Sequence, residues 1–148
     1  MTALVRRFIK TAILFLILGL LLGAGMLVQR ELFGAWPAPY VISAHTHAVF
    51  VGFVMFMILG VALWIFPKPL QDDRRYRPAL IETVYWLLLT GTLLRFGGEL
   101  VRAYTAMPLG PLVLLAGLAQ VASLLLYVWT MWYRIRPSAR MLREGQDN

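Results

Sequence analysis

Residues 41–66 read VISAHTHAVFVGFVMFMILGVALWIF and contain no lysine, arginine, aspartate or glutamate. A helix of about 20 residues crosses the hydrocarbon core of a bilayer, because each residue adds about 1.5 Å of length. This stretch is therefore long enough to span a membrane. A strand would leave its backbone polar groups unpaired in lipid, so a helix is the expected conformation.

Similar stretches recur along the chain, and the sequence predicts spans at about residues 8–30, 41–66, 80–103 and 109–133. The 148 residues are 60% hydrophobic and 14% charged, a composition that a water-soluble domain of this length cannot bury. Short connections make successive helices antiparallel neighbours. We therefore predict an all-α integral membrane protein, with residues 1–148 forming one antiparallel four-transmembrane-helix bundle.

Positive charge is distributed unevenly between the two sides of this predicted bundle. Of the 14 lysines and arginines, all but Arg30, Arg95 and Arg102 lie at the N-terminus, in the 67–80 loop or in the C-terminal tail. The positive-inside rule places these three segments, and so both termini, in the cytoplasm. We expect a prokaryotic inner membrane, whose anionic lipids account for the net charge of +7 without a nucleic-acid partner.

Several classes of protein are excluded by residue types that the chain lacks. It has no cysteine, which excludes disulfide scaffolds, c-type haem attachment, iron–sulfur clusters and zinc–thiolate sites. No nucleophile–base set, phosphate-binding loop or acidic dyad is recognisable, so a hydrolase or transferase is not expected.

The ionisable residues within the spans gather at one depth. His45 and His47, the only histidines, lie in the first two turns of the second span. Arg95, Glu99 and Arg102 lie in the last turns of the third span, which runs the opposite way. Ionisable side chains within a span are costly and indicate a functional site. We therefore expect these five residues to form one polar layer of the bundle.

The two histidines are separated by one residue, which places them about 200° apart around a regular helix. They cannot comfortably hold one metal ion together, but they can serve two sites on opposite sides. Neutral imidazole is a good axial ligand of haem iron. Gly52 lies seven residues after His45, on the same face, and would leave room for a flat macrocycle. The alternative is that one histidine caps the helix and the other hydrogen-bonds a neighbour.

Arg95 and Glu99 form an i,i+4 pair on one helix face. One interpretation is a self-neutralised ion pair that joins two helices. The other is that Arg95 or Arg102 neutralises a carboxylate such as a haem propionate, with Glu99 as an orienting group or proton carrier. The Gly19-x-x-x-Gly23 pattern in the first span is a helix-packing signal and indicates no chemistry.

The second span resembles a helix of a known family. The shared residues are Ala44-His45-Thr46-His47, Val49, Phe56, Ile58, Gly60 and the terminal Phe66-Pro67. They resemble the tenth transmembrane helix of the catalytic subunit of haem–copper oxidases. The resemblance implies haem b as cofactor, with His45 and His47 as ligands of haems on opposite sides of the helix. A complete haem–copper centre is not expected in one chain, because its copper site needs further histidines.

Three function classes stay open at this point. The first is a b-type haem protein for electron transfer or gas-related redox chemistry, beside a respiratory or denitrification partner. The second is a copper- or iron-binding or assembly protein that uses His45, His47 and Glu99. The third is a cofactor-free scaffold subunit of a larger complex. The sequence leaves open whether the protein is an enzyme.

The resemblance also implies an oligomer. The oxidase subunit has twelve helices in three pseudo-repeats of four, and this chain is one repeat long. In that subunit the low-spin haem takes its ligands from two repeats, at positions that match His45 and His47. One chain has a single copy of this helix with diverging rings, so two chains are needed to supply both ligands. A heterologous contact repeated three times closes a ring. We expect a homotrimer with subunit-bridging haems.

Overall fold

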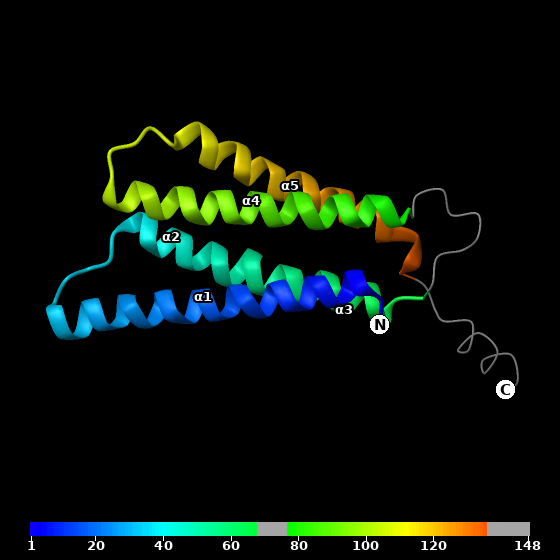
Figure 1. The fold of residues 1–148 in the computed structure, drawn as a ribbon, viewed down its shortest axis with the longest axis horizontal. Coiled ribbons are helices and arrows are strands. Elements are labelled where there is room, and N and C mark those ends of the chain that lie inside the picture. Colours follow the sequence, from blue (N-terminus) through cyan, green and yellow to red (C-terminus); the bar gives the residue numbers. More distant parts are fainter. Residues whose placement is uncertain (68–76, 136–148) are drawn as a thin grey trace, which may run out of the picture.

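The structure is a computed structural model that describes residues 1–67 and 77–135. The described residues are helical and contain no strand. The elements are α1 (Ala3–Phe33), α2 (Pro39–His47), the π-helix η1 (Ala48–Met55), α3 (Phe56–Ile65), α4 (Pro78–Tyr104), α5 (Gly110–Met131) and the short 3₁₀ turn η2 (Trp132–Arg134). α2, η1 and α3 follow one another without a break, so residues 1–67 and 77–135 form four main helices (Figure 1).

Among the described residues, four helices are long and apolar enough to cross a membrane, which confirms the predicted all-α class with four helices that can span. The first helix is longer than the predicted 8–30 at both ends. At its start the Thr2 side chain accepts a hydrogen bond from the backbone N–H of Val5. At its end Gly34 adopts a left-handed conformation with φ of 62°, which glycine tolerates best.

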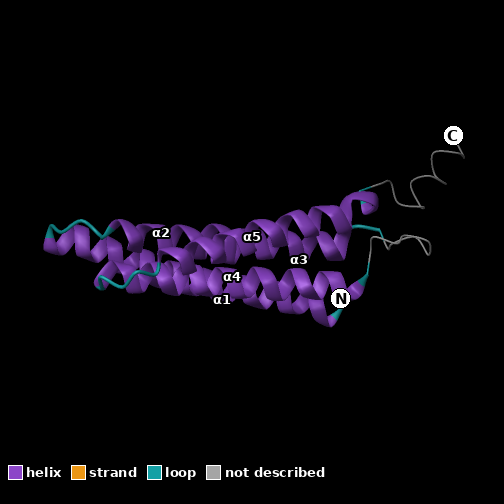
Figure 2. Ribbon diagram, turned by 90° about the horizontal axis from the view of Figure 1, so that it is seen from above, coloured by secondary structure: helices purple, strands orange, loops and turns teal. Residues whose placement is uncertain are grey.

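α1 packs on the α2–η1–α3 helix, that helix packs on α4, and α4 packs on α5, so α1 and α5 lie at opposite edges in Figure 1. Figure 2 shows two layers, α1 with α4 and the α2–η1–α3 helix with α5. Side-chain hydrogen bonds join Thr11 of α1 to Tyr85 of α4 and Tyr127 of α5 to the Leu59 carbonyl of α3. The rings of Phe8, Phe56 and Tyr85 meet between the first three helices. The N-terminus, the end of α3 and the start of α4 lie at one end (Figure 1). We call the opposite end, with the connections 34–38 and 105–109, the distal end.

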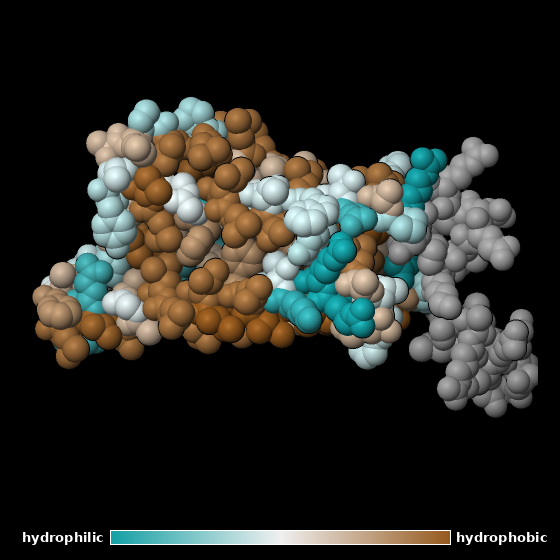
Figure 3. All heavy atoms as spheres, in the orientation of Figure 1, coloured by the Kyte–Doolittle hydropathy of each residue, from teal (hydrophilic) through white to brown (hydrophobic). Residues whose placement is uncertain are grey.

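Large apolar side chains cover the outside of the bundle, as expected of helices that face lipid. Leu21 of α1 is 67% exposed and Leu125 of α5 is 66% exposed. Figure 3 shows apolar side chains over most of the visible face, with hydrophilic ones gathered toward the N-terminal end. These surfaces indicate a multi-pass membrane protein associated with lipid. The basic residues Lys68, Arg74, Arg75, Arg136, Arg140 and Arg143 lie outside the described residues.

The middle of the second span departs from the regular α-helix assumed from the sequence. Ala48–Met55, directly after His47, forms the π-helix η1, in which each turn is wider than in an α-helix. Gly52 lies in this segment, and a Cβ atom there would overlap the Phe15 ring. The ring of α1 therefore occupies the space that a side chain at position 52 would need. π-Turns often occur at functional sites.

Arg134, in the 3₁₀ turn η2 that follows α5, is buried and binds the C-terminal end of α3. Its Nε donates to the carbonyl of Pro67 at 2.8 Å, and its Nη2 donates to the carbonyl of Phe66 at 2.9 Å. Nη2 also donates at 3.2 Å to the carbonyl of Leu63, in the last turn of α3. The last carbonyls of a helix lack partners within the helix and carry partial negative charge, which a guanidinium stabilises. Arg134 thus fixes the end of α5 against the end of α3.

Candidate functional site

His45 lies on α2 and faces α1. Its Nδ1 atom is 3.0 Å from the carbonyl oxygen of Gly19. A Cβ atom on Gly23 would be 2.9 Å from Cε1 of His45, so glycine is needed for the ring to lie there. A carbonyl oxygen only accepts hydrogen bonds, so Nδ1 must carry the hydrogen. The neutral ring then keeps its lone pair on Nε2.

His47 has the same arrangement but faces another helix. Its Nδ1 atom is 2.8 Å from the carbonyl oxygen of Ser43, so Nδ1 again carries the hydrogen and Nε2 the lone pair. The same Nδ1 lies 3.3 Å from Oε2 of Glu99 on α4. The His47 side chain is 21% exposed.

The predicted divergence of the two histidines is therefore confirmed, because His45 contacts α1 and His47 contacts α4. In the part of the chain that the structure describes, no group of three histidine, cysteine, aspartate or glutamate residues is placed to hold one metal ion. His45, His47 and Glu99 thus do not converge, and the alternative that they bind a single copper or iron ion is not supported by this geometry.

Glu99 is 3% exposed and lies at the centre of a polar network. Its Oε1 accepts from the Ser43 hydroxyl at 2.9 Å and from Nε of Arg95 at 3.2 Å. Nη1 of Arg95 donates to Oε1 of Gln120 on α5 at 3.4 Å, and Nε2 of Gln120 donates to the Thr92 hydroxyl at 3.1 Å. The predicted Arg95–Glu99 pair is confirmed, and it joins three helices where the sequence indicated two.

The second carboxylate oxygen of Glu99 is not satisfied in the same way. Oε2 is buried and has no hydrogen-bond partner among the described residues, although Nδ1 of His47 is 3.3 Å away. The two observations agree when the Nδ1–H of His47 points mainly at the Ser43 carbonyl, so that its angle to Oε2 is poor. A buried acceptor without a donor costs about 1–3 kcal/mol.

Of the two interpretations of Arg95, the structure shows the local ion pair, in which its anionic partner is Glu99 of the same helix. Arg102 lies closer to the distal end and binds α2 through Tyr40. Its guanidinium is 4.3 Å from the centre of the Tyr40 ring and its Nη2 donates to the phenolic oxygen. Arg102 thus contacts a neutral partner and has no carboxylate contact among the described ion pairs.

Gly52 lies toward α1, as does His45, but the space beside it is not open. The Phe15 ring fills it, and Gly52 is buried. The expectation of room for a macrocycle at this glycine is therefore not met, because packing of α1 against η1 uses the space.

Open space near His45 lies instead toward the distal end. A cavity of about 280 Å³ is lined by His45 together with Gly23, Met26, Leu27, Arg30, Trp36, Pro37 and Ile42. Arg30 was not expected in a site, because the sequence placed it at the edge of the first span. α1 continues to Phe33, which keeps Arg30 on the helix, where it also pairs with Glu31 at 2.6 Å.

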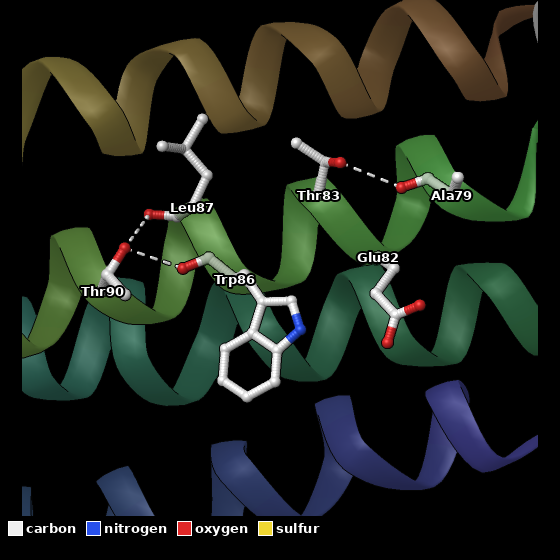
Figure 4. Close-up of a pocket in the computed structure, with 6 residues that line it drawn as sticks. All are labelled: Ala79, Glu82, Thr83, Trp86, Leu87 and Thr90. Carbon is white, nitrogen blue, oxygen red and sulfur yellow. Dashed lines mark hydrogen bonds between the residues drawn. The ribbon is translucent and has the colours of Figure 1, made fainter.

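A second cavity, of about 600 Å³, lies along α4 and is lined by Ala79, Glu82, Thr83, Trp86, Leu87 and Thr90 (Figure 4). The hydroxyls of Thr83 and Thr90 donate to carbonyls of their own helix. This cavity contains none of the predicted site residues.

Sequence analysis missed four residues that build the site: Gly19, Gly23, Ser43 and Gln120. The two glycines carried a signal, because the Gly19-x-x-x-Gly23 pattern is recognisable as a packing motif. In the structure the same pattern also positions His45, because the carbonyl of Gly19 accepts its hydrogen bond and the missing side chain of Gly23 leaves space for the imidazole ring. Ser43 and Gln120 were detectable as polar residues within apolar spans, which commonly hydrogen-bond across helices.

Residues 2–135 match a family described as Domain of unknown function (DUF8744). The chain belongs to this family. The match includes all four helices and both histidines. No curated protein and no solved structure matches the chain.

Replacing Gly23 with alanine should destabilise the protein by about 1–2 kcal/mol, because the new methyl group displaces the His45 ring. Gly25→Ala is the matched control on the same helix, since a Cβ atom at that position would have nothing within 4 Å. Alanine favours helix over glycine by up to about 1 kcal/mol, so the control should be neutral or stabilising. Thermal unfolding in one detergent measures both variants, and equal effects would contradict the assigned role of Gly23.

Proposed function

We propose that this chain is a b-type haem protein of the membrane, which transfers electrons or takes part in gas-related redox chemistry, with His45 and His47 as axial ligands. The supporting observation is the hydrogen bonding of the two imidazole rings. Each directs Nδ1 to a backbone carbonyl, and no described hydrogen bond engages either Nε2. Histidines that bind metals typically have this arrangement, in which a carbonyl fixes the ring and its tautomer and leaves the other nitrogen as ligand.

The residues around the rings suit a haem in their chemistry. Haem b needs neutral imidazole ligands and cations for its two propionates, and when bound it supplies a one-electron redox centre. The carbonyls of Gly19 and Ser43 orient the ligands. Arg30 lines the cavity at His45. Arg102, whose described partner is the neutral Tyr40, is a better propionate partner than Arg95, which is held by Glu99.

The proposal includes a shared site. Because Nδ1 of His45 contacts α1 and Nδ1 of His47 lies beside Glu99 of α4, we expect the two Nε2 atoms of one protomer to serve different irons. A homotrimer in which each haem takes His45 from one chain and His47 from the next satisfies both rings. The likeness of residues 44–67 to the haem–copper oxidase helix supports this assembly, and a respiratory or denitrification protein is the proposed redox partner.

The visible spectrum of the purified protein tests the proposal. A Soret band with a sharp α-band on reduction is expected, and it should be absent from the His45→Ala/His47→Ala double variant. A colourless protein that carries copper or iron by elemental analysis would favour the metal-binding alternative. A colourless protein without metal would favour the scaffold alternative.

We also propose that both termini face the cytoplasm of a prokaryote, since the basic segments adjoin the end opposite the distal end. A reporter that is active only in the cytoplasm, fused after Asn148, is expected to be active. Activity of a reporter that works only outside the cytoplasmic membrane would contradict this orientation.

A further inference from the structure

Glu99, the buried centre of the polar network, has no role in the proposed haem binding. Glu99 is almost fully buried, its Oε1 receives two donors, and its Oε2 receives none among the described residues. The nearest described donor is Nδ1 of His47, at 3.3 Å. Three polar atoms lie near this Nδ1: the Ser43 carbonyl, which accepts its hydrogen bond at 2.8 Å, the Ser43 hydroxyl at 3.4 Å and Oε2 of Glu99.

The two histidines therefore differ in one respect. Nδ1 of each histidine has a backbone carbonyl as its acceptor, but only Nδ1 of His47 also has a carboxylate oxygen nearby, at 3.3 Å. A negative charge beside an imidazole N–H polarises the ring and makes its other nitrogen a stronger electron donor. This electrostatic effect is stronger where water is excluded, because a medium of low dielectric constant screens the charge less than water does.

We infer that Glu99 is a positioning residue that makes His47 a stronger donor ligand than His45, because its carboxylate places a negative charge beside the Nδ1–H that the Ser43 carbonyl accepts. This inference rests on the proposed function as far as the ligand is haem. Arg95 has a supporting part, because it binds the other oxygen of Glu99 and leaves Oε2 directed at His47.

The first experiment measures the midpoint potential of the haem in the purified protein. A stronger donor ligand stabilises ferric iron, so Glu99→Gln should raise the potential. We expect about a tenfold change in the equilibrium constant for reduction, which is about 59 mV for a one-electron couple. Glu82→Gln is the matched control, because it removes a carboxylate of the same helix that binds Arg7 on the exposed surface. An unchanged potential in Glu99→Gln would overturn the inference.

A second variant separates this effect from general loosening of the site. Ser43→Ala removes a hydroxyl that donates to Oε1 at 2.9 Å and lies 3.4 Å from Nδ1 of His47, but it keeps the charge of Glu99 and the carbonyl that accepts from His47. The carboxylate then has more charge to share with His47, and the potential should fall. A structural disturbance would move both variants in the same direction, so shifts of equal sign would count against the inference.

A third measurement needs no haem. The chain has two histidines, so ¹⁵N-histidine labelling of the haem-free protein gives two rings to compare. The Nδ1 proton of His47 should resonate downfield of that of His45, and should move upfield in Glu99→Gln. A His47 ring that carries its hydrogen on Nε2 would overturn the inference. A protein that binds no haem but shows this shift would contradict the proposed function and leave the role of Glu99 intact.

Discussion

His45→Ala and His47→Ala are each expected to remove haem from the purified protein, because each variant deprives every shared site of one ligand. The expected haem-to-protein ratio is close to zero for both. Gly25→Ala serves as the control for handling and expression, since that position has open space beside it. Normal haem content in either histidine variant would show that this ring is not a ligand.

Mixed oligomers of the two variants give the stronger result. A chain with His45→Ala still supplies His47, and a chain with His47→Ala still supplies His45. In trimers assembled at random from equal amounts of both chains, about one quarter of the subunit contacts bring an intact His45 and an intact His47 together. Purification of co-expressed variants through two different affinity tags leaves only mixed trimers, and each of these has one such contact out of three. They should therefore regain about a third of the wild-type haem. Variants blended after assembly should stay empty, and failure of verified mixed oligomers to bind haem would exclude the shared site.

The depth and direction of the histidines were predictable from the sequence. Antiparallel spans put His47 and Glu99 at one level regardless of their distance along the chain, and the helical period alone separates the two rings. These features depend on helix geometry, which a sequence pattern encodes directly. The acceptor of His45 was not predictable, since Gly19 offers a backbone carbonyl whose availability depends on how closely α1 packs.

The π-helix could not be predicted from the sequence either, because it too depends on how the helices pack. The composition of Ala48–Met55 suits any buried helix and does not distinguish a π-helix from an α-helix. The feature that sets this segment apart is the packing of Phe15 against Gly52, which depends on the tertiary structure. The sequence favours Gly52 as a place for a ligand, but a glycine in a bundle makes room for whatever lies opposite it. In this protein that is a phenylalanine of α1.

Arg95→Leu is expected to destabilise the bundle by about 3–5 kcal/mol, because it leaves the buried carboxylate of Glu99 without its cation. Glu99 is 3% exposed, and its remaining described donor is the Ser43 hydroxyl. Arg7→Leu is the matched control, since the Arg7–Glu82 pair is about half exposed and such pairs contribute less than about 1 kcal/mol. Unfolding by a denaturing detergent, followed by circular dichroism, measures both.

The double variant Arg95→Leu/Glu99→Gln tells whether charge is the cause. Removing both charges leaves no ion buried alone, so the double variant should be more stable than Arg95→Leu by about 2–3 kcal/mol. Loss of packing or of the Gln120 contact alone would instead make the second substitution neutral or harmful. Recovery would show that the pair joins α2, α4 and α5 by neutralising a buried carboxylate. Neutralised in this way, the carboxylate lies beside His47 in an apolar layer of the bundle without unfolding the protein.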